Sequence, residues 1–448
     1  MQGHWIPAYA GMTNPNCRPS EGWGPVSFRC FDNGNAQRMN APQPLLTAAQ
    51  AIESLLAAAQ PIIGTDILST LEANGRILAE AQSSKIDVPS ADNSERDGYA
   101  VRAADCVSGS ATLKVTQRIP AGQVGQPLQA GTAARIFTGA MIPQGADAVV
   151  MQEDCVTQGA QVTINYKPAE GEWVRRAGED IRNGSVILPA GTRLHPQELG
   201  LAASVGLAVL PVVRKLCVAV FSTGDELTMP GEELKPGAIY NSNRFVLRGL
   251  LENLGCEIAD YGIVPDTLDA TRSTLHRAAQ ENDVIITSGG VSVGEEDYIK
   301  PAVEAEGRLK MWQLAIKPGK PLAFGAINRA ANSEGIAHFI GLPGNPVSVL
   351  ITFMLFVRPF LMRLQGVQDV TPKAYAMRAD FSLLKGDRRN EFLRARINAQ
   401  GGLDLFPNQG SGVLTSTVWA DGLIDNPPDR SIAVGDTVRF LPFSELLN

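Results

Sequence analysis

Five apolar stretches between residues 216 and 347 each lead into a short loop that is polar or rich in glycine. These loops begin at Ser222, Pro265, Ser288, Lys317 and Pro343. Helical patterns separate the first three stretches, and this βαβαβ alternation is typical of a parallel sheet. The carboxyl ends of parallel strands share one edge, where ligands bind. We therefore expect the five loops to meet in one cleft.

The hydrophobic pattern outside this region predicts a multidomain α/β protein. The Thr47–Gln50 pair forms a capping box that opens a helical pattern. Alternation of apolar and polar residues then predicts two β-rich regions. The expected parts are N-terminal helices that pack with the sheet and linking domains (45–83), a β-rich domain (84–184), the second part of a mixed linking domain (185–214), a parallel α/β domain (215–366) and a C-terminal β-barrel-like domain (367–448).

The first 38 residues show no periodicity, and we expect a disordered leader there. An ordinary flexible leader and a start assigned too early, with Met39 as the true start, both remain open. The segment has neither a basic stretch nor a continuous apolar core at its beginning, so it does not match a signal peptide.

Length, charge and cysteine content exclude several classes of protein. The 448 residues exceed the size of one ordinary domain, and a net charge of −7 disfavours nucleic acid as the main partner. No apolar run reaches the ~18 residues that span a bilayer, and the run at 347–357 is interpreted as a buried helix. The six cysteines are scattered without a CxxC pair and the four histidines are dispersed. Free thiols are typical of a reducing compartment, so we expect a cytoplasmic protein.

Two of the loops are suited to an anionic ligand. Ser288, Gly289 and Gly290 follow an apolar stretch directly, and glycines let backbone N–H groups approach an anion closely. In the segment Pro343, Gly344, Asn345, Pro346, the asparagine suits a helix N-cap and the second proline suits the first helical position. Free N–H groups would then face the same edge. Each segment taken alone is also compatible with a tight turn or a well-capped helix.

Charged residues accompany these loops. Lys317 and Lys320 bracket a Pro-Gly turn; a lysine pair is often only solvated, but here the preceding stretch directs both to the cleft. Carboxylates beside a phosphate repel it unless a hard cation intervenes, and Mg²⁺ bound by one or two carboxylates and substrate phosphates is the usual arrangement. Some of these carboxylates could instead cap helices. The candidate carboxylates are Asp225, Glu226, Asp266, Glu295, Glu296 and Asp297.

Three further polar segments lie outside the predicted sheet domain: DNSERDGYA from Asp92, TGAMIPQGAD from Thr138 and RRAGED from Arg175. Physical reasoning alone gives them no reaction. Together with FSTGDEL, SGGVSVGEED, AIKPGKP and GLPGNPVS they resemble, in the same order, the motifs of the molybdopterin molybdenumtransferase family, which is the MoeA type and includes the carboxy-terminal domain of animal gephyrin. The resemblance runs from about Leu45 to the end of the chain.

The resemblance implies an enzyme of the last step of molybdenum cofactor synthesis, in which molybdate is inserted into adenylylated molybdopterin and AMP is released with the help of Mg²⁺. It implies an elongated homodimer whose cleft lies between the sheet domain of one subunit and the β-rich domain of the other. Residues 86–167 are too few to close a cleft over the distant sheet of their own chain. Candidate further partners are the molybdopterin adenylyltransferase and apo-molybdoenzymes, with neither nucleic acid nor membrane.

Site residues follow from the motifs. Those implied for catalysis are Asp297, Glu295, Glu226, Lys317, Lys320, Asp97 and Asp180. Those implied for binding the pterin nucleotide are Thr138, Ser288, Gly289, Gly290, Asp266, Pro343, Gly344, Asn345 and Pro346. The Mg²⁺ ligands would be Asp225, Glu226, Glu295 and Asp297, and the molybdate pocket would hold Lys317, Arg394 and Ser411. Asp97, Thr138 and Asp180 would come from the partner subunit.

The chain departs from the family pattern at Gln313, where a basic residue is common, and at Asn241, where aspartate is frequent. Two alternatives remain at this point. A molybdopterin adenylyltransferase shares the sheet domain, but the segments at Asp92 and Thr138 and the predicted barrel count against it. A pure scaffold, as in receptor clustering by gephyrin, is disfavoured by the lysines and carboxylates. The choice between molybdate and tungstate is left open.

Overall fold

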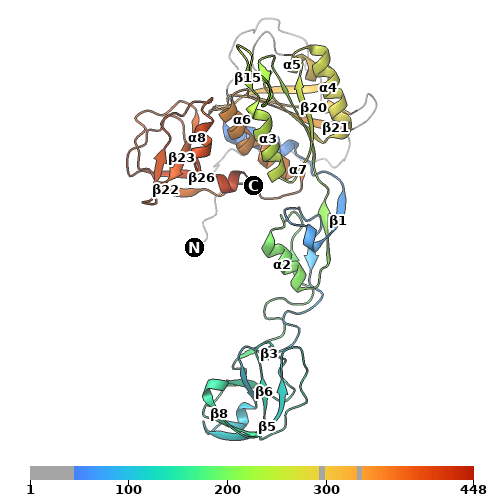
Figure 1. Cartoon of the computed structure of the whole chain (residues 1–448), viewed down its shortest axis with the longest axis vertical. Helices are drawn as coiled ribbons and strands as arrows, with labels where there is room; N and C mark the ends of the chain where they lie inside the picture. The colour runs from blue at the N-terminus through green and yellow to red at the C-terminus, as the bar shows by residue number, and fades with distance from the viewer. Residues whose placement is uncertain (1–44, 292–297, 330–334, 448) are drawn as a thin grey trace, which may run out of the picture. The chain divides into compact units, whose positions relative to one another are not determined.

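The computed structural model describes residues 45–291, 298–329 and 335–447. Its central element is a six-stranded sheet with the order β16 (Glu257–Val264), β13 (Cys217–Thr223), β17 (Val284–Ser288), β21 (Ile336–Leu342), β20 (Pro321–Asn328) and β18 (Gly307–Gln313) (Figure 1). The first four strands are parallel, which confirms the predicted parallel sheet.

The last two strands correct one detail of that prediction. The stretch before Lys317 forms β18, which pairs antiparallel with β20, and β20 pairs antiparallel with β21. A short connection joins β18 to β20, and such a hairpin requires antiparallel strands. Two reversals give β18 the same direction as β21. Its carboxyl end therefore still lies at the edge where the parallel strands end.

Helices cover both faces of this sheet. One apolar core unites the sheet with α1 (Ala48–Ala58), α3 (Ser242–Asn253), α6 (Pro346–Thr352) and α7 (Arg358–Leu364). The other lies under α4 (Leu268–Glu281) and α5 (Ile299–Glu306). The predicted helices between the first three strands are thus confirmed as α3 and α4.

The buried helix predicted from the apolar run at 347–357 is confirmed and extends to Leu364. Residues Pro346–Leu364 are long and apolar enough to cross a membrane, but 83% of the relevant window is buried inside the protein. A π-helical turn, Phe353–Val357, links α6 to α7. Pro359 lacks an N–H group, and a local widening of the helix next to proline accommodates the lost hydrogen bond. The segment therefore serves as a core helix of the sheet domain.

The N-terminal region is only half helical. Thr47 and Gln50 form the expected capping box at α1. The prediction of more than one helix within residues 45–83 is wrong: Thr65–Ser69 form β1, which is followed by a 3₁₀ turn, Thr70–Glu72. β1 pairs antiparallel with β12 (Val209–Val213). Partner strands decide strand formation more than local propensity does, and β12 comes from far along the sequence.

The β1–β12 ribbon belongs to the linking domain, together with α2 (Pro196–Ser204) and the short pair β2 (Gln82–Ser83) and β11 (Val186–Leu188). Its small core contains residues from both predicted halves, including Leu78, Leu188 and Leu210.

The domain predicted to be rich in β-strands is confirmed as such. Its sheet has the order β7 (Ala148–Met151), β4 (Gly98–Val101), β6 (Thr132–Ile136), β5 (Ala111–Ile119), β9 (Gln161–Ile164) and β8 (Cys155–Gln158). Two short strands, β3 (Asn93–Ser94) and β10 (Val174–Arg175), pair beside it. Two apolar clusters form the core of the β-rich domain, separate from the cores of the sheet domain.

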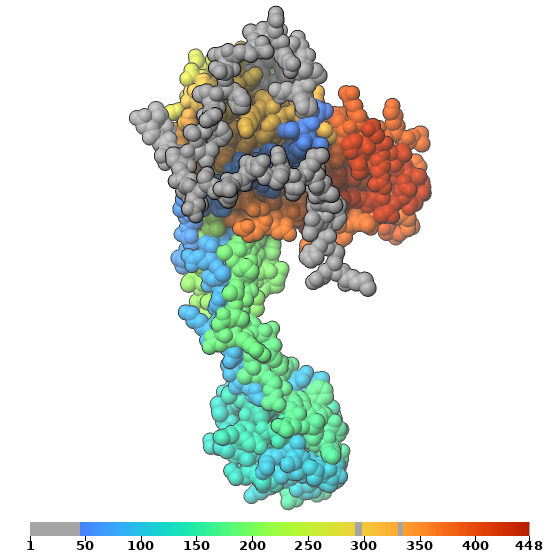
Figure 2. Space-filling view, turned by 180° about the vertical axis from the view of Figure 1, so that it is seen from behind, coloured from blue at the N-terminus to red at the C-terminus, as the bar shows by residue number. Residues whose placement is uncertain are grey.

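The C-terminal domain is a second mixed sheet. Its order is β19 (Ile316–Lys317), β23 (Asn390–Ile397), β25 (Gly422–Asn426), β26 (Thr437–Pro442) and β22 (Tyr375–Arg378), with β24 (Leu403–Leu405) beside β23. Helices α8 (Thr415–Trp419) and α9 (Phe443–Leu446) complete it, and Figure 2 shows it as a compact body in red and orange. β19 comes from the sheet domain and pairs parallel with β23. Lys317 is thereby fixed between the two domains.

Candidate functional site

The predicted loops meet around a cavity of about 650 Å³. It is lined from the sheet domain by residues that follow β13, β16, β17, β18 and β21, and from the C-terminal domain by two loops. The predicted residues on its wall are Glu226, Asp266, Gly289, Gly290, Lys317, Lys320, Pro343, Gly344, Asn345 and Ser411. Ser288 and Pro346 line an adjoining cavity of about 550 Å³ that shares Glu226, Gly289 and Asn345 with it.

The glycine loop brings backbone, rather than side chains, to the cavity. Gly289 and Gly290 have φ of 91° and 64°, in the left-handed region. A Cβ atom on Gly289 would lie 2.9 Å from the carbonyl oxygen of Thr223. The preceding Ser288 is buried and its Oγ lies 3.3 Å from that of Ser222. This loop is therefore built for a close approach of its main chain to a ligand.

The start of α6 is shared with the C-terminal domain. Asn345 occupies the N-cap position and Pro346 the first helical position, as predicted, although the Asn345 side chain makes no capping hydrogen bond. The N–H of Val347 donates to the carbonyl oxygen of Ser411 at 3.0 Å. This bond places Ser411 beside the helix start, on the wall of the cavity.

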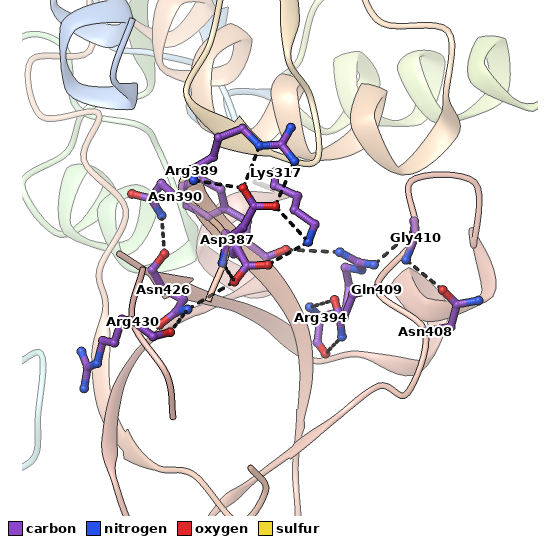
Figure 3. A network of polar contacts seen from close by, with 12 residues as sticks. Lys317, Asp387, Arg389, Asn390, Arg394, Asn408, Gln409, Gly410, Asn426 and Arg430 are labelled. Atoms are coloured by element: carbon purple, nitrogen blue, oxygen red, sulfur yellow. Dashed lines mark hydrogen bonds and ion pairs between the residues drawn. The ribbon is translucent and has the colours of Figure 1, made fainter. Parts of the chain in front are cut away.

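Lys317 belongs to a network of four charges (Figure 3). Its Nζ donates to Glu391 Oε1 at 3.1 Å and lies 3.3 Å from Asp387 Oδ2. Burial disfavours the charged lysine, but the bonds to Glu391 and Asp387 outweigh it and raise the pKa of Lys317. The Arg389 guanidinium donates hydrogen bonds to both carboxylate oxygens of Asp387. These bonds are the largest cause of the lowered pKa of Asp387. Two cations are thus oriented by two carboxylates.

Lys320 differs from Lys317 in its environment. Its side chain is exposed, and across residues 45–291, 298–329 and 335–447 it has no ion pair. Its backbone carbonyl accepts from the N–H of Leu314, which closes the β18–β20 connection. Lys320 is also among the residues that line the cavity.

Arg394 does not reach the cavity wall. It is 1% exposed, and its guanidinium donates to Ser416 Oγ and to the carbonyl oxygens of Phe392 and Gly410. Burial without a carboxylate partner lowers its pKa to about 10. Gln409 connects the loop to the same residue, since it accepts from the Arg394 N–H and donates to its carbonyl oxygen. Arg394 holds the Ser411 loop instead of contacting the cavity.

On the side of the C-terminal domain, sequence reasoning missed three lining residues: Arg389, Gln409 and Gly410. The segment GDRRNEFLRARI contains four arginines, and only the turn before β23 decides that Arg389 faces the cavity. A signal for Gln409 exists in the polar run NQGSG before α8, which is loop-like and next to the predicted Ser411.

The carboxylates are distributed unevenly. Glu226 and Asp266 line the cavity, whereas Asp225 is exposed and lies outside the lining. Glu295, Glu296 and Asp297 lie outside the described residues. Within the described ranges, no three or more His, Cys, Asp or Glu side chains group to hold a metal. Among the described residues, Glu226 and Asp266 are the carboxylates that line the cavity.

The residues predicted from the β-rich domain form their own cluster. Asp97 Oδ1 accepts hydrogen bonds from both the N–H and the Oγ1 of Thr138, each at 2.8 Å. The backbone bond from Thr138 is the largest cause that lowers the pKa of Asp97. Asp180 is exposed. Within the described part of the chain, none of the three is among the residues that line the 650 Å³ cavity.

Neither departure from the family pattern disrupts the fold. Asn241 is buried, and its Oδ1 accepts the Arg244 N–H as the N-cap of α3. Gln313 ends β18, where it pairs with Pro321.

This architecture defines a multidomain α/β protein with a cavity between the carboxyl edge of a parallel sheet and a C-terminal β-domain. Models of the MoeA N-terminal region (domains I and II), a probable molybdopterin-binding domain and the MoeA C-terminal region (domain IV) match residues 46–206, 219–363 and 376–443. The chain belongs to the MoeA family, the molybdopterin molybdenumtransferases.

Individual relatives agree over nearly the whole chain. A protein of Haemophilus influenzae named molybdopterin molybdenumtransferase is 41% identical over 90% of this chain and all of its own length. Molybdopterin molybdenumtransferase 2 of Mycobacterium tuberculosis is 35% identical over 85% of this chain and 94% of its own. The crystal structure of the molybdopterin biosynthesis MoeA protein from Pyrococcus horikoshii OT3 superposes with a TM-score of 0.77, at 30% identity, over 89% of this chain and all of that one.

Proposed function

We propose that this protein is a molybdopterin molybdenumtransferase that inserts molybdate into adenylylated molybdopterin and releases AMP. The observation that carries the proposal is the cavity in which the glycine loop, the Lys317–Lys320 turn and the Ser411 loop converge. Matches to the MoeA regions on both sides of the molybdopterin-binding domain favour it over an adenylyltransferase.

The residues divide into two groups by chemistry. Backbone N–H groups of Gly289 and Gly290, with the α6 start at Asn345, suit the phosphates of the pterin nucleotide. Lys317, Arg389 and Ser411 supply charged and hydroxyl donors for a tetrahedral dianion. Molybdate and tungstate share this chemistry, so the same pocket suits either oxyanion.

In the reaction, water or a molybdate oxygen attacks the adenylyl phosphorus, the phosphoanhydride bond to molybdopterin breaks, and AMP leaves with the added oxygen. Lys320 is placed to neutralise charge that builds on the phosphates. Charge neutralisation and positioning are the main contributions of a protein to phosphoryl chemistry.

The cavity fits Mg²⁺ as a cofactor. Glu226 and Asp266 are two carboxylates on one wall, and Mg²⁺ is usually held by one or two carboxylates together with substrate phosphates and water. Bound there, the ion would offset phosphate charge. Asp225, Glu295 and Asp297 remain further candidates from their motifs.

A cytoplasmic homodimer is part of the proposal, with Asp97, Thr138 and Asp180 of one subunit facing the cavity of the other. The linking domain supports an interface. Along β1 and β12, Ile67 and Val209 are 66% and 54% exposed, and the flanking Ile63 and Leu71 are each 93% exposed. Exposed apolar groups concentrated on a two-stranded ribbon are typical of a surface covered by a partner. Contacts with the adenylyltransferase and apo-molybdoenzymes would follow from substrate transfer.

The test is reconstitution from purified components. Protein, adenylylated molybdopterin, molybdate and Mg²⁺ are mixed, and AMP release and activation of an apo-molybdoenzyme are measured. We expect both to depend on molybdate and on Lys317. AMP release without cofactor formation, or formation of adenylylated molybdopterin from ATP, would contradict the proposal.

A further inference from the structure

A separate cavity of about 590 Å³ lies on the C-terminal domain side of Lys317 and Arg389. It is lined by Lys317, Lys385, Gly386, Asp387, Arg388, Arg389 and Asp429. Lys317 and Arg389 are also on the wall of the 650 Å³ cavity. The two cavities therefore share these two cations as a common wall.

The lining of the smaller cavity is strongly cationic. It holds four basic side chains and two carboxylates, a formal excess of two positive charges on a chain of net charge −7. Asp387 is already engaged by both Arg389 and Lys317. Lys385 and Arg388 are exposed and, among the described residues, have no ion pair. Local positive potential in a cleft concentrates anions even on a negatively charged protein.

The loop that carries these cations is fixed by its backbone. The Asp387 N–H donates to Glu391 Oε2 at 3.0 Å, and the Asp387 carbonyl oxygen accepts from the Asp429 N–H at 2.8 Å. A Cβ on Gly386 would lie 2.5 Å from the Arg430 carbonyl oxygen, so this close packing requires glycine. Lys385 and Arg388 therefore lie on a turn whose backbone is held by hydrogen bonds and close packing.

We propose that this cavity is an entrance vestibule for the oxyanion substrate. Lys385 and Arg388 attract the dianion from solution. Lys317 and Arg389 then exchange Asp387 for the oxyanion, which passes along their shared wall into the larger cavity. Figure 3 shows that Lys317 and Arg389 both contact Asp387. In the absence of the oxyanion, this carboxylate keeps the two cationic side chains in position. The inference deepens the proposed function and rests on it.

The experiment compares three variants with the unchanged protein. Arg388→Gln and Lys385→Gln each remove one charge from the vestibule, and Lys373→Gln removes one exposed charge from the same domain outside the lining. Binding of molybdate alone is measured by calorimetry, and kcat/KM for molybdate is measured in the reconstituted reaction, both at ~0.01 M and ~0.5 M salt. Charges act over ~30 Å at the lower salt and only a few ångströms near 1 M.

We expect Arg388→Gln and Lys385→Gln to lower kcat/KM for molybdate about fivefold at low salt and hardly at all at high salt, because steering is screened. The kcat at saturating molybdate and the binding of the pterin nucleotide should not change. Lys373→Gln should match the unchanged protein at both salts. If the vestibule variants match Lys373→Gln, or their defect persists at high salt, the vestibule is rejected. If the unchanged protein neither binds molybdate nor forms cofactor, the proposed function itself fails.

Discussion

Burying a guanidinium without a carboxylate partner costs folding free energy, and Arg394 is buried in this way. Its guanidinium donates to the carbonyl oxygen of Gly410 and to Ser416 Oγ, and these two residues flank Ser411 in the sequence. The planar fork of arginine can reach several acceptors at once, whereas lysine offers a single point charge. We therefore infer that Arg394 is a positioning residue that acts on the oxyanion through Ser411.

This role predicts a non-additive pair of substitutions. Arg394→Lys keeps the charge but loses the fork, and should raise the KM for molybdate about tenfold, equivalent to ~1.4 kcal/mol. Adding Ser411→Ala to it should change little more, because Ser411 is already misplaced.

The measurement is the KM for molybdate in all single and double variants, with thermal unfolding to confirm folding. Full additivity of Arg394→Lys with Ser411→Ala would refute the positioning role. A normal KM in Arg394→Lys would show that charge alone matters.

The glycine loop gives a second residue-scale prediction. Gly289→Ala forces a side chain into the left-handed region and against the Thr223 carbonyl oxygen, which should cost about 1–2 kcal/mol of stability. Gly344→Ala is the matched control, because an added Cβ there meets no atom within 4 Å. Urea unfolding and pterin-nucleotide binding are measured for both. Equal stability of the two variants would mean that the loop does not need glycine at position 289.

Sequence reasoning at this scale placed loop residues such as Lys317 and Ser411 at the cleft, and both line the cavity. It placed Arg394 at the oxyanion and missed Arg389. The two arginines are five positions apart in one basic segment. Arg394 lies within β23, where its side chain is enclosed, and Arg389 lies in the turn before it. Which arginine is enclosed depends on the strand boundary and on the 409–416 loop, and neither is encoded locally.

At the scale of elements, Asp283 joins the amino ends of β13 and β17 to Arg214, which precedes β13, and to Arg329, which follows β20. It accepts both Nη groups of Arg214, one Nη of Arg329 and the N–H of Cys217. Burial raises the pKa of Asp283, but the hydrogen bonds from Arg214, followed by Cys217, outweigh it and the pKa is lowered. A depressed carboxyl pKa stabilises the fold above the unfolded value of 3.8.

Asp283→Asn should therefore lower the free energy of unfolding by about 1.5–3 kcal/mol near pH 7, the size of a hydrogen bond to a charged group. The difference from the unchanged protein should stay constant down to about pH 5 and shrink as pH falls below 3.8, because the carboxyl of the unfolded chain then binds a proton before the native carboxylate does. Urea unfolding across pH measures it, with the exposed Glu281→Gln as control. If the difference in unfolding free energy between Asp283→Asn and the unchanged protein does not depend on pH, the ionised carboxylate of Asp283 is not its cause.

Elements with a strong internal pattern were predictable, and those fixed by distant partners were not. The capping box of α1 and the alternation in β5 are local signals. The segment Thr65–Ser69 contains residues of mixed propensity, and its strand state depends on pairing with residues 209–213. The direction of β18 likewise depended on its hairpin with β20.

At the scale of the whole molecule, the order of domains could be predicted because each has its own periodicity and its own apolar core. Which subunit completes the cavity could not, because no local pattern encodes an association between chains. The cavity is lined by the sheet and C-terminal domains, while Asp97 and Thr138 are bonded to one another in the β-rich domain. A shared site between two copies would bring both sets together.

Mixed dimers test this arrangement directly. Asp97→Asn and Lys317→Gln chains, with different tags, are co-expressed, and doubly tagged dimers are isolated. In a shared site, the mixed dimer combines the intact Lys317 of one chain with the intact Asp97 of the other, so one of its two cavities is complete. Each variant alone should be nearly inactive, the isolated mixed dimer should recover about half of normal cofactor formation, and a random mixture about a quarter, as expected for a two-fold dimer with independent sites. A cavity completed within one chain would leave every mixed dimer as inactive as its parents, and light scattering that shows only monomers at micromolar concentration would also reject the shared site.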